Sequence, residues 1–270
     1  MGTVKQNKKG GLRRFIYRLT FGFSLLPISL AVNITNVCNR KCLFCPYHGK
    51  LKYNNHTKWF KLQPEFLNYQ SFYEFLSKLG IFRKLIRHIS ITGKGEPLMH
   101  PHFMQFCRII NYFKIPFSIT TNGDDLSLES LYTLLSFKYL RGIRVSVYDR
   151  KSMKFWNEVS KYLDKVTLFN QTGKPYPGVP EGYITANYGV DHPRALKDFN
   201  VERFCDAPFH FLTINTDGSI VPCYSYNQTS HITDSLWGIW NGKLIRKYRR
   251  ESVNGRNCLL ADCLNCGINL

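Results

Sequence analysis

Acidic residues are scarce in this sequence, where 18 Asp and Glu stand against 37 Lys and Arg in 270 residues, a formal net charge of +19. Internal repeats, low-complexity tracts and long apolar runs are absent, and only 12 prolines occur. The chain is nevertheless 44% hydrophobic and 15% aromatic, which excludes a disordered or fibrous protein. A chain of this length forms one large domain, or one domain with an appendage, and buries a substantial core.

The positive charge is concentrated in two segments. Residues 1–20 contain basic residues and no acid, and residues 243–256 contain basic residues and one acid, Glu251. Such segments suit an acidic partner, namely nucleic acid, anionic lipid, a phosphorylated substrate or an acidic peptide, and a solvated basic surface is the alternative. Residues 8–20 also fit a short basic amphipathic helix, so peripheral membrane contact stays open.

The most apolar part of the N-terminal region, residues 21–32, is too short and too polar to span a bilayer. Arg18 and Pro27 interrupt it and no small-residue cleavage site follows, which argues against a signal peptide. Apolar residues alternate with small or polar ones from residue 28 to residue 34, so we predict a strand there.

Nine cysteines fall mainly in two clusters, at 38–45 and 258–266, with Cys205 and Cys223 between them. Clustered cysteines in a chain of this length favour metal ligation over a disulfide scaffold. They therefore predict a reducing, cytoplasmic setting.

The first cluster places Cys38, Cys42 and Cys45 on one loop directly after the predicted strand. Three thiolates leave one corner of a four-iron cluster without a protein ligand, and an open metal position is where a substrate or cofactor binds. A zinc site completed by a distant fourth ligand and a set of reduced core cysteines are the alternatives.

Strands alternate with helices after this loop, which predicts an α/β protein with a parallel sheet whose ligands bind at the carboxyl ends of the strands. We expect aromatic residues of the first helix, Phe66 and Tyr73 among them, to face the core. Cys107 lies among apolar residues of a helix and is expected to be a buried thiol. The predicted strands are 88–92, 116–121, 143–147 and 165–169, with 183–188 as a further candidate, and the predicted helices are 64–80, 101–113, 127–137 and 153–164.

Short polar turns follow three of the predicted strands. Gly93-Lys94-Gly95-Glu96-Pro97 follows the second, Thr120-Thr121-Asn122-Gly123 ends the next, and Ser146 lies near the end of the strand after that. Glycine lets the backbone approach a ligand closely, and a carboxylate can hold an ammonium group. An ordinary turn is the alternative reading of each.

The C-terminal part has a different organisation. Residues 170–200 are irregular, residues 211–215 and 219–223 predict a hairpin joined by Asp217-Gly218, and 235–250 predicts one helix. Cysteines flank the hairpin and recur near the C-terminus, which indicates a closed four-ligand site, with zinc as an alternative to iron. Its candidate ligands are Cys205, Cys223, Cys263 and Cys266, with Cys258 left over or as a substitute.

The Cys-x3-Cys-x2-Cys loop, with Phe44 before its last cysteine, closely resembles the signature of the radical SAM enzymes. The three strand-end turns resemble positions at which that superfamily contacts its cofactor, although Lys94 stands where many members have Gly. The resemblance implies a 4Fe-4S cluster on Cys38, Cys42 and Cys45 whose open iron chelates S-adenosylmethionine. It also implies cofactor contacts from Phe44, Gly95, Glu96, Pro97, Thr121, Asn122 and Ser146.

The Cys205-x12-Gly218-x4-Cys223 segment resembles the opening of the SPASM and twitch extensions of these enzymes. It implies a second 4Fe-4S cluster, on Cys205, Cys223, Cys263 and Cys266. The fold implied is a partial (β/α)6 barrel followed by a small β-hairpin plus helix domain. We expect a basic segment at 1–24, the barrel at 25–195 and the auxiliary-cluster domain at 196–270.

In such an enzyme, a flavodoxin- or ferredoxin-type donor supplies the electron that cleaves S-adenosylmethionine, and the resulting 5′-deoxyadenosyl radical abstracts a hydrogen atom from the substrate. The C-terminal pattern is most similar to the aminocyclitol dehydrogenases, which implies an oxidoreductase or epimerase acting on an acidic or polar, sugar-like molecule, with the second cluster handling the second electron. Tyr148, Asn170 and Arg194 are candidate substrate contacts.

Two other functions stay open. One is modification of a ribosomally made peptide, for which the 27 residues before the first strand are too few to form a leader-binding domain. The other is a zinc-binding module whose basic surface binds nucleic acid. Modification of RNA also stays compatible with the charge, although no added RNA-binding module is visible.

Overall fold

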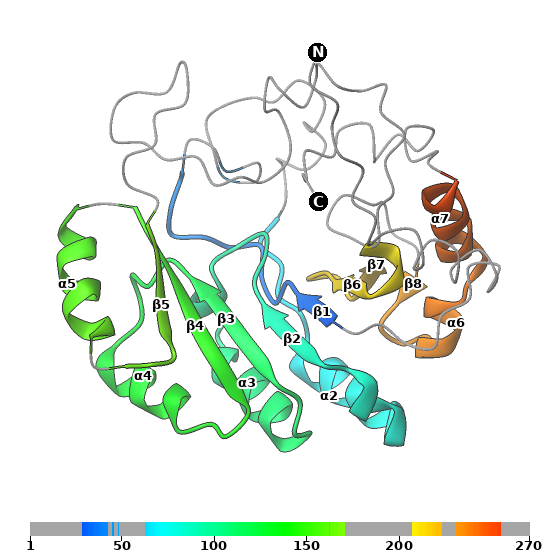
Figure 1. The fold of residues 1–270 in the computed structure, drawn as a ribbon, viewed down its shortest axis with the longest axis horizontal. Coiled ribbons are helices and arrows are strands. Elements are labelled where there is room, and N and C mark those ends of the chain that lie inside the picture. Colours follow the sequence, from blue (N-terminus) through cyan, green and yellow to red (C-terminus); the bar gives the residue numbers. More distant parts are fainter. Residues whose placement is uncertain are drawn as a thin grey trace, which may run out of the picture.

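The computed structural model describes residues 29–42, 45, 48, 63–148, 150–161, 163–170, 207–222 and 230–254. One eight-stranded sheet organises them, in the order β5-β4-β3-β2-β1-β6-β7-β8 (Figure 1). Its strands are β1 (Ser29–Val32), β2 (His88–Ile91), β3 (Phe117–Thr121), β4 (Leu140–Val147), β5 (Val166–Asn170), β6 (Phe211–Ile214), β7 (Ser219–Val221) and β8 (Ser230–His231).

Strands β1 to β5 pair in parallel and in chain order, as the alternation of strands and helices predicts. The helices that connect them lie along one side of the sheet (Figure 1). They are α2 (Tyr69–Lys78), α3 (Phe103–Tyr112), α4 (Leu128–Leu135) and α5 (Arg150–Ser160), with short 3-10 helices η2 (Gly80–Leu85) and η3 (Pro97–Met99).

A sixth parallel strand lies on the other side of β1. It is β6, which pairs with β1 from Ser29↔Phe211 to Val32↔Ile214 and continues into the antiparallel strands β7 and β8. The predicted hairpin is therefore part of the same sheet as the parallel strands. The candidate strand at 183–188 and the expected boundary at 195/196 lie outside the described residues.

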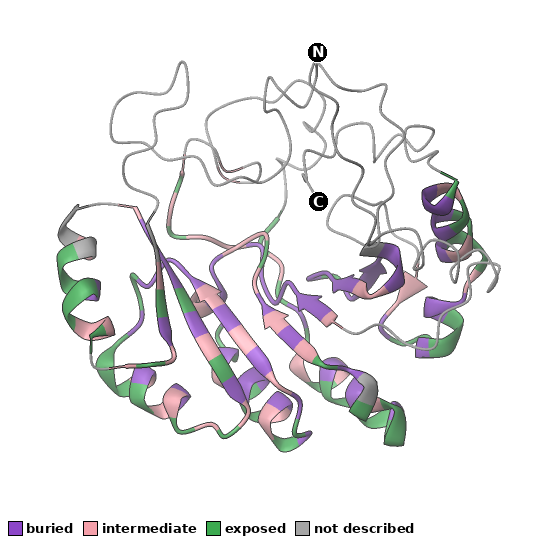
Figure 2. Ribbon diagram, in the orientation of Figure 1, coloured by how far each residue is buried: buried purple, intermediate pink, exposed green. Residues whose placement is uncertain are grey.

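The two faces of the sheet differ in polarity. Side chains on the helix-covered face, such as Ile89, Ile119 and Ile143, are completely or almost completely buried, and they join the core cluster that includes helix residues. Residues next to them along the strands, such as Ser90, Thr120 and Arg144, are polar and more exposed, and Figure 2 shows exposed residues between buried ones in the first part of β4. The core thus lies between sheet and helices, and the opposite face of the sheet is the more polar one.

Cys107 is completely buried in α3, as predicted. The predicted start of the first helix is wrong. Asn68 caps α2 by accepting a hydrogen bond from the Ser71 N–H, so the helix begins at Tyr69. Phe66 precedes the helix, and Phe66 and Tyr73 are 43% and 44% exposed. The prediction that these two residues face the core is therefore wrong.

The single helix predicted at 235–250 is also wrong. Two helices occur there, α6 (Leu236–Trp240) and α7 (Lys243–Val253). The chain turns at Asn241-Gly242, where Gly242 approaches the Gly238 carbonyl so closely that a Cβ atom would lie 2.7 Å from its oxygen. The spacing of apolar residues continues across the break, which is why the pattern alone suggests one helix.

A buried arginine attaches α7 to the rest of the C-terminal region. The Arg249 side chain is fully buried, and its Nε donates a 2.7 Å hydrogen bond to the Pro208 carbonyl in η4 (Ala207–Phe209). Its guanidinium also lies 4.0 Å from the ring centroid of Trp240. No helix in the described ranges has both the length and the apolar character needed to span a bilayer.

Candidate functional site

A cleft opens at the carboxyl ends of β1 to β4. The loop after β1 contributes Cys38, Cys42 and Cys45 to its wall. The turn after β2 adds residues 92–96, and the ends of β3 and β4 add residues 120–122, Ser146 and Tyr148. Parallel strands thus bring together four segments that are far apart in the sequence.

The three thiols of the cysteine loop lie close enough to influence one another. Burial raises the pKa of Cys38 to about 11, and burial together with the neighbouring thiols Cys45 and Cys38 raises the pKa of Cys42 to about 12. A metal must therefore displace the protons of these thiols when it binds. The backbone N–H of Arg40 donates to the Cys38 sulfur at 3.4 Å, and that of His48 donates to the Cys45 sulfur at 3.3 Å.

This donor set fits an iron–sulfur cluster. Among the described residues, no three His, Cys, Asp or Glu side chains are close enough together to share one metal ion. In a cubane cluster each thiolate binds a different iron, so its ligands surround a larger group than a single ion. Three thiols that line one cleft are therefore compatible with such a cluster.

Glu96 joins the turn after β2 to the end of β3. Its carboxylate accepts hydrogen bonds from the Thr121 hydroxyl at 2.6 Å, from the Asn122 N–H at 2.7 Å and from the Leu98 N–H at 3.2 Å. Burial raises the pKa of Glu96, and these three hydrogen bonds act in the opposite direction. Three donors around one buried carboxylate match the hydrogen bonding of an anion, which suits an ammonium group in the cleft.

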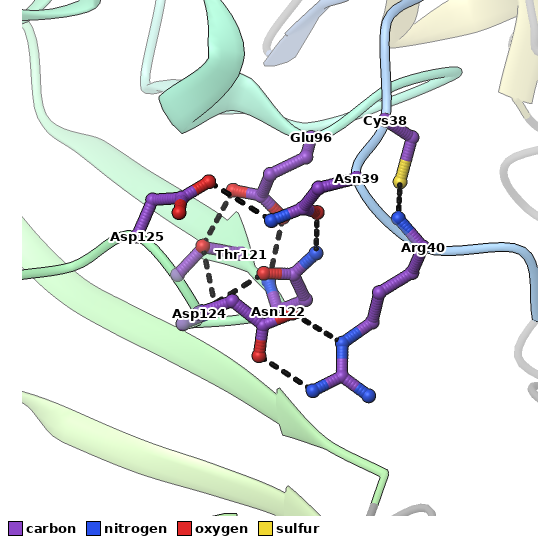
Figure 3. Close-up of polar contacts among 9 residues, drawn as sticks. Cys38, Asn39, Arg40, Glu96, Thr121, Asn122, Asp124 and Asp125 are labelled. Atoms are coloured by element: carbon purple, nitrogen blue, oxygen red, sulfur yellow. Dashed lines mark hydrogen bonds and ion pairs between the residues drawn. The ribbon is translucent and has the colours of Figure 1, made fainter.

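A polar bridge, formed by Asn39 and Arg40 with Asn122, Asp124 and Asp125, connects the cysteine loop to the turn after β3 (Figure 3). Asn39 donates to the Asp125 carboxylate at 2.9 Å and accepts from the Asn122 side chain at 2.7 Å. Arg40 forms a two-pronged ion pair with Asp124. The residues between the first two cysteines thus hold the loop in place over the strand ends.

Five predicted cofactor contacts line this cleft, namely Gly95, Glu96, Thr121, Asn122 and Ser146. Pro97 is buried at the start of η3 and is not among the lining residues. Tyr148, a candidate substrate contact, lines the cleft as well, and the Arg40 guanidinium lies 5.1 Å from its ring centroid. For Asn170 only its position at the end of β5 is described.

The polar bridge was not predicted from the sequence. The consecutive acids Asp124 and Asp125, directly after the turn at 120–123 in a chain poor in acids, are the signal that could have revealed it. Phe44, Arg194, Cys258 and the four auxiliary-cluster candidates, Cys205, Cys223, Cys263 and Cys266, lie outside the described residues.

Two family models match the chain. The model of the radical SAM superfamily matches residues 32–148, and that of the SPASM iron–sulfur cluster-binding domain matches residues 205–267. A curated relative, the "Probable GTP 3',8-cyclase" of Pyrococcus abyssi, is 28% identical over 150 residues, which are 52% of this chain and 43% of the relative. The protein of the same name from Methanocaldococcus jannaschii is 28% identical over 148 residues, 53% of this chain and 43% of that relative. The chain thus spans less than half the length of these relatives.

Solved structures share the fold over most of the chain. BtrN in complex with AdoMet and 2-DOIA has a TM-score of 0.67 and 18% identity, with 92% of this chain and 95% of BtrN covered. Streptococcus suis SuiB bound to the precursor peptide SuiA has a TM-score of 0.54 and 13% identity, with 99% of this chain and 76% of SuiB covered. The fold is therefore an unclosed partial α/β barrel of the kind seen in BtrN and SuiB.

Proposed function

Since the chain belongs to the radical SAM superfamily and carries a SPASM iron–sulfur cluster-binding domain, we propose that it abstracts a hydrogen atom from a polar, sugar-like small molecule. The net reaction we propose is dehydrogenation or epimerisation, which makes the protein an oxidoreductase or epimerase. The observation that carries the proposal is the cleft, in which three thiols of one loop face the hydrogen-bonded Glu96 carboxylate.

The two domains imply 4Fe-4S clusters and S-adenosylmethionine as cofactors. When bound, they supply the one-electron chemistry that generates a hydrogen-abstracting radical. We propose that Cys38, Cys42 and Cys45 hold the first cluster and that Glu96 receives the ammonium group of S-adenosylmethionine. Gly95, Thr121, Asn122 and Ser146 then line the rest of the cofactor site, and Pro97 supports the turn. We further propose that Phe44 contacts the cofactor.

We assign the second cluster to Cys205, Cys223, Cys263 and Cys266, all of which lie in or near the segment that matches the SPASM model. Its role in the proposal is to handle the second electron of the reaction. A flavodoxin- or ferredoxin-type protein is the electron donor that such clusters require, and the clustered cysteines suit the reducing cytoplasm.

A small-molecule substrate is supported by the polar inner face of the sheet and by the likeness to BtrN, whose structure holds 2-DOIA. Peptide modification is the second candidate, because SuiB, which shares the fold, is solved with a precursor peptide. The names of the curated relatives indicate GTP, but the match spans only 43% of their length. We therefore retain from them only that a polar, charged substrate is compatible with this family.

Anaerobic purification tests the cofactor assignment. We expect a brown protein with about eight irons per chain for two cubane clusters. After chemical reduction with S-adenosylmethionine present, it should form 5′-deoxyadenosine, and Cys42→Ala should not. A colourless protein with stoichiometric zinc and no 5′-deoxyadenosine would overturn the proposal.

Deuterated substrates test the substrate class. A panel of uniformly deuterated aminocyclitols and sugars is compared with a deuterated peptide, and 5′-deoxyadenosine is analysed by mass spectrometry. We expect deuterium to enter 5′-deoxyadenosine from a small molecule. Incorporation from the peptide alone would favour the second candidate.

A further inference from the structure

An exposed apolar segment lies at the end of the sheet opposite the cleft. It is η2, in which Ile81 is 77% exposed and Phe82 is 59% exposed. Strand β2 begins shortly after it, so η2 lies at the amino ends of the parallel strands, whereas the cleft opens at their carboxyl ends. Large apolar side chains that are exposed together mark a binding surface, which a single exposed one does not.

The fold holds this segment in place. Gly80, with φ +52°, turns the chain out of α2 in the left-handed conformation that glycine adopts readily. Leu79 and Ile86, on either side of the exposed residues, are buried in the core. The backbone N–H of Phe82 also donates to the Leu79 carbonyl at 3.0 Å. Ile81 and Phe82 are therefore presented to solvent by a turn that is anchored at both ends.

Aromatic side chains join η2 to α2 and to the end of α3, which lie side by side (Figure 1). The centroid of the Phe113 ring lies 5.4 Å from that of Tyr73 and 5.2 Å from that of Tyr112. The guanidinium of Arg83, the residue after Phe82, lies 5.3 Å from the centroid of the same ring. Tyr112 is 69% exposed. We call the exposed members of this group the apolar patch, namely Tyr73, Ile81, Phe82 and Tyr112.

Positive charge borders the apolar patch. Four basic residues beside it in the chain are exposed, namely Lys78, Lys84, Arg87 and Lys114. From residue 73 to residue 123 the sequence contains two acids, Glu74 in α2 and Glu96, which is buried beside the cleft. An anionic surface is therefore the partner whose charge complements this end of the sheet.

A lipid surface fits the apolar patch better than a protein does. Three of the four basic residues that border it are lysines, which protein interfaces disfavour, whereas anionic headgroups attract lysine and arginine alike. Tyrosine and phenylalanine beside an aliphatic side chain are typical of groups that enter the headgroup region of a bilayer. A second copy of this chain would bring two positively charged surfaces together, which their repulsion opposes.

We propose that the apolar patch attaches the protein to the surface of an anionic lipid bilayer. Ile81 and Phe82 enter the headgroup region, and the lysines and Arg87 contact the lipid phosphates. Because the patch lies at the amino ends of the strands, the cleft then lies on the side away from the bilayer. The inference is independent of the reaction and of the substrate proposed above.

Cosedimentation of the full-length protein with sucrose-loaded vesicles tests the inference. One set of vesicles contains equal parts of phosphatidylglycerol and phosphatidylcholine, and the other contains phosphatidylcholine alone. We expect binding to the anionic vesicles, which Ile81→Ser with Phe82→Ser weakens by about tenfold or more. The matched control is Leu128→Ser with Tyr132→Ser, which removes two exposed apolar side chains from α4 and should bind as the wild type does.

The contribution of the lysines is measured in the same assay. Lys78→Gln with Lys84→Gln should weaken binding to the anionic vesicles by about tenfold at low salt and by less at high salt, where the charges are screened. Lys243→Gln with Lys247→Gln is the matched control. It removes the same charge from two exposed positions on α7, so a smaller effect is expected.

A further variant, Phe82→Trp, keeps the apolar patch and reports on insertion. Brominated phosphatidylcholine in the anionic vesicles should quench the fluorescence of the added indole beyond the quenching seen in the wild type. Melting temperature and iron content are measured for every variant, and we expect them to stay at their wild-type values because the substituted side chains are exposed.

Equal binding of the wild type and of Ile81→Ser with Phe82→Ser overturns the inference, because another basic surface, such as residues 8–20, then binds the lipid. A wild-type protein that binds neither set of vesicles, or a Phe82→Trp indole that is not quenched, overturns it as well. If the serine variant instead abolishes binding to polyglutamate, or a concentration-dependent dimer, in a protein that ignores the vesicles, the partner is an acidic protein or a second copy of the chain.

Discussion

At the scale of single residues, Glu96 does more than line the cleft. The residue is 3% exposed, and its carboxylate accepts hydrogen bonds from three positions in two segments. The same carboxylate therefore shapes the cleft and contributes its charge to it. A sequence motif identifies the residue, but only the structure shows that the protein itself provides three of its hydrogen-bond donors.

Glu96→Gln replaces one acceptor oxygen with an NH2 group that faces a donor. A charge-assisted hydrogen bond contributes about 1.5–3 kcal/mol, so we expect a loss of stability of this order and a lower melting temperature. Binding of S-adenosylmethionine should weaken as well, because the negative charge is gone. Iron in the first cluster should be retained, since no thiol is touched. A variant with unchanged melting temperature and affinity would contradict the role assigned to Glu96.

Asp124→Asn tests whether the polar bridge positions the cysteine loop. The side chains of Arg40 and Asp124 are 22% and 29% exposed, so their ion pair is partly shielded from solvent. We expect its loss to weaken the binding of S-adenosylmethionine by about 1 kcal/mol, roughly a fivefold change in affinity. Glu158→Gln is the matched control. It breaks the exposed ion pair between Glu158 in α5 and Lys161 just after that helix, and neither residue lines the cleft. Equal effects of the two variants, measured by equilibrium binding, would show that the bridge does not position the cysteine loop.

At the scale of elements, the cleft depends on how closely the turn after β2 approaches the end of β1. Gly95 lies so close that a Cβ atom would be 2.3 Å from the Val37 carbonyl oxygen and 2.7 Å from that of Thr35. The Glu96 N–H also donates to the Val37 carbonyl at 2.8 Å. Both contacts involve backbone, which cannot move aside as the end of a long side chain can.

Gly95→Ala should therefore separate the two segments, lower the melting temperature and reduce the iron bound by the first cluster. Gly80→Ala is the matched control. Gly80 has φ +52° with nothing within 4 Å of an added Cβ, so its substitution should cost only about 1–2 kcal/mol of backbone strain. If Gly95→Ala is no more harmful than Gly80→Ala, as judged by melting temperature and iron content, the close approach is unimportant.

The positions of helices and strands could be predicted from the periodicity of apolar residues wherever one face of the element is buried and the other is not. The alternation in 28–34 and the apolar spacing of 101–113 each reflect one buried face, and both predictions are confirmed as β1 and α3. Where a local contact decides at which residue a helix begins or ends, the spacing of apolar residues is insufficient to predict it. The cap at Asn68 and the turn at Gly242 depend on single hydrogen bonds or close approaches, and the apolar spacing continues past them.

At the scale of the whole molecule, the two proposed clusters should be separable. Cys263→Ala with Cys266→Ala removes two ligands of the second cluster and none of the first. We expect about half of the roughly eight irons to be lost, while uncoupled formation of 5′-deoxyadenosine persists. Loss of all 5′-deoxyadenosine with the first cluster intact by electron paramagnetic resonance would contradict the auxiliary role of these cysteines.

The candidate site could be predicted where its functional residues form short motifs in the sequence. The spacing of Cys38, Cys42 and Cys45 and the turn at Glu96 identify the cleft, and the structure places them together in it. The polar bridge and the neighbours of individual strand residues were not predictable in the same way, because each depends on how the strands align in the sheet. Arg144 becomes a partner of Thr120 and Thr167 only when β3, β4 and β5 align.

The position of β1 between β2 and β6 also fixes an order of assembly. One neighbour of β1 follows about sixty residues later, whereas the Asn33 side chain bonds to Asn215, 182 positions away. Such distant pairings fold slowly, because a long loop must close before the contact forms. During synthesis, β1 lacks its second neighbour until the segment that contains β6 has left the ribosome. We therefore expect iron to be loaded after the hairpin has been synthesised, when the strand that carries the loop has both neighbours.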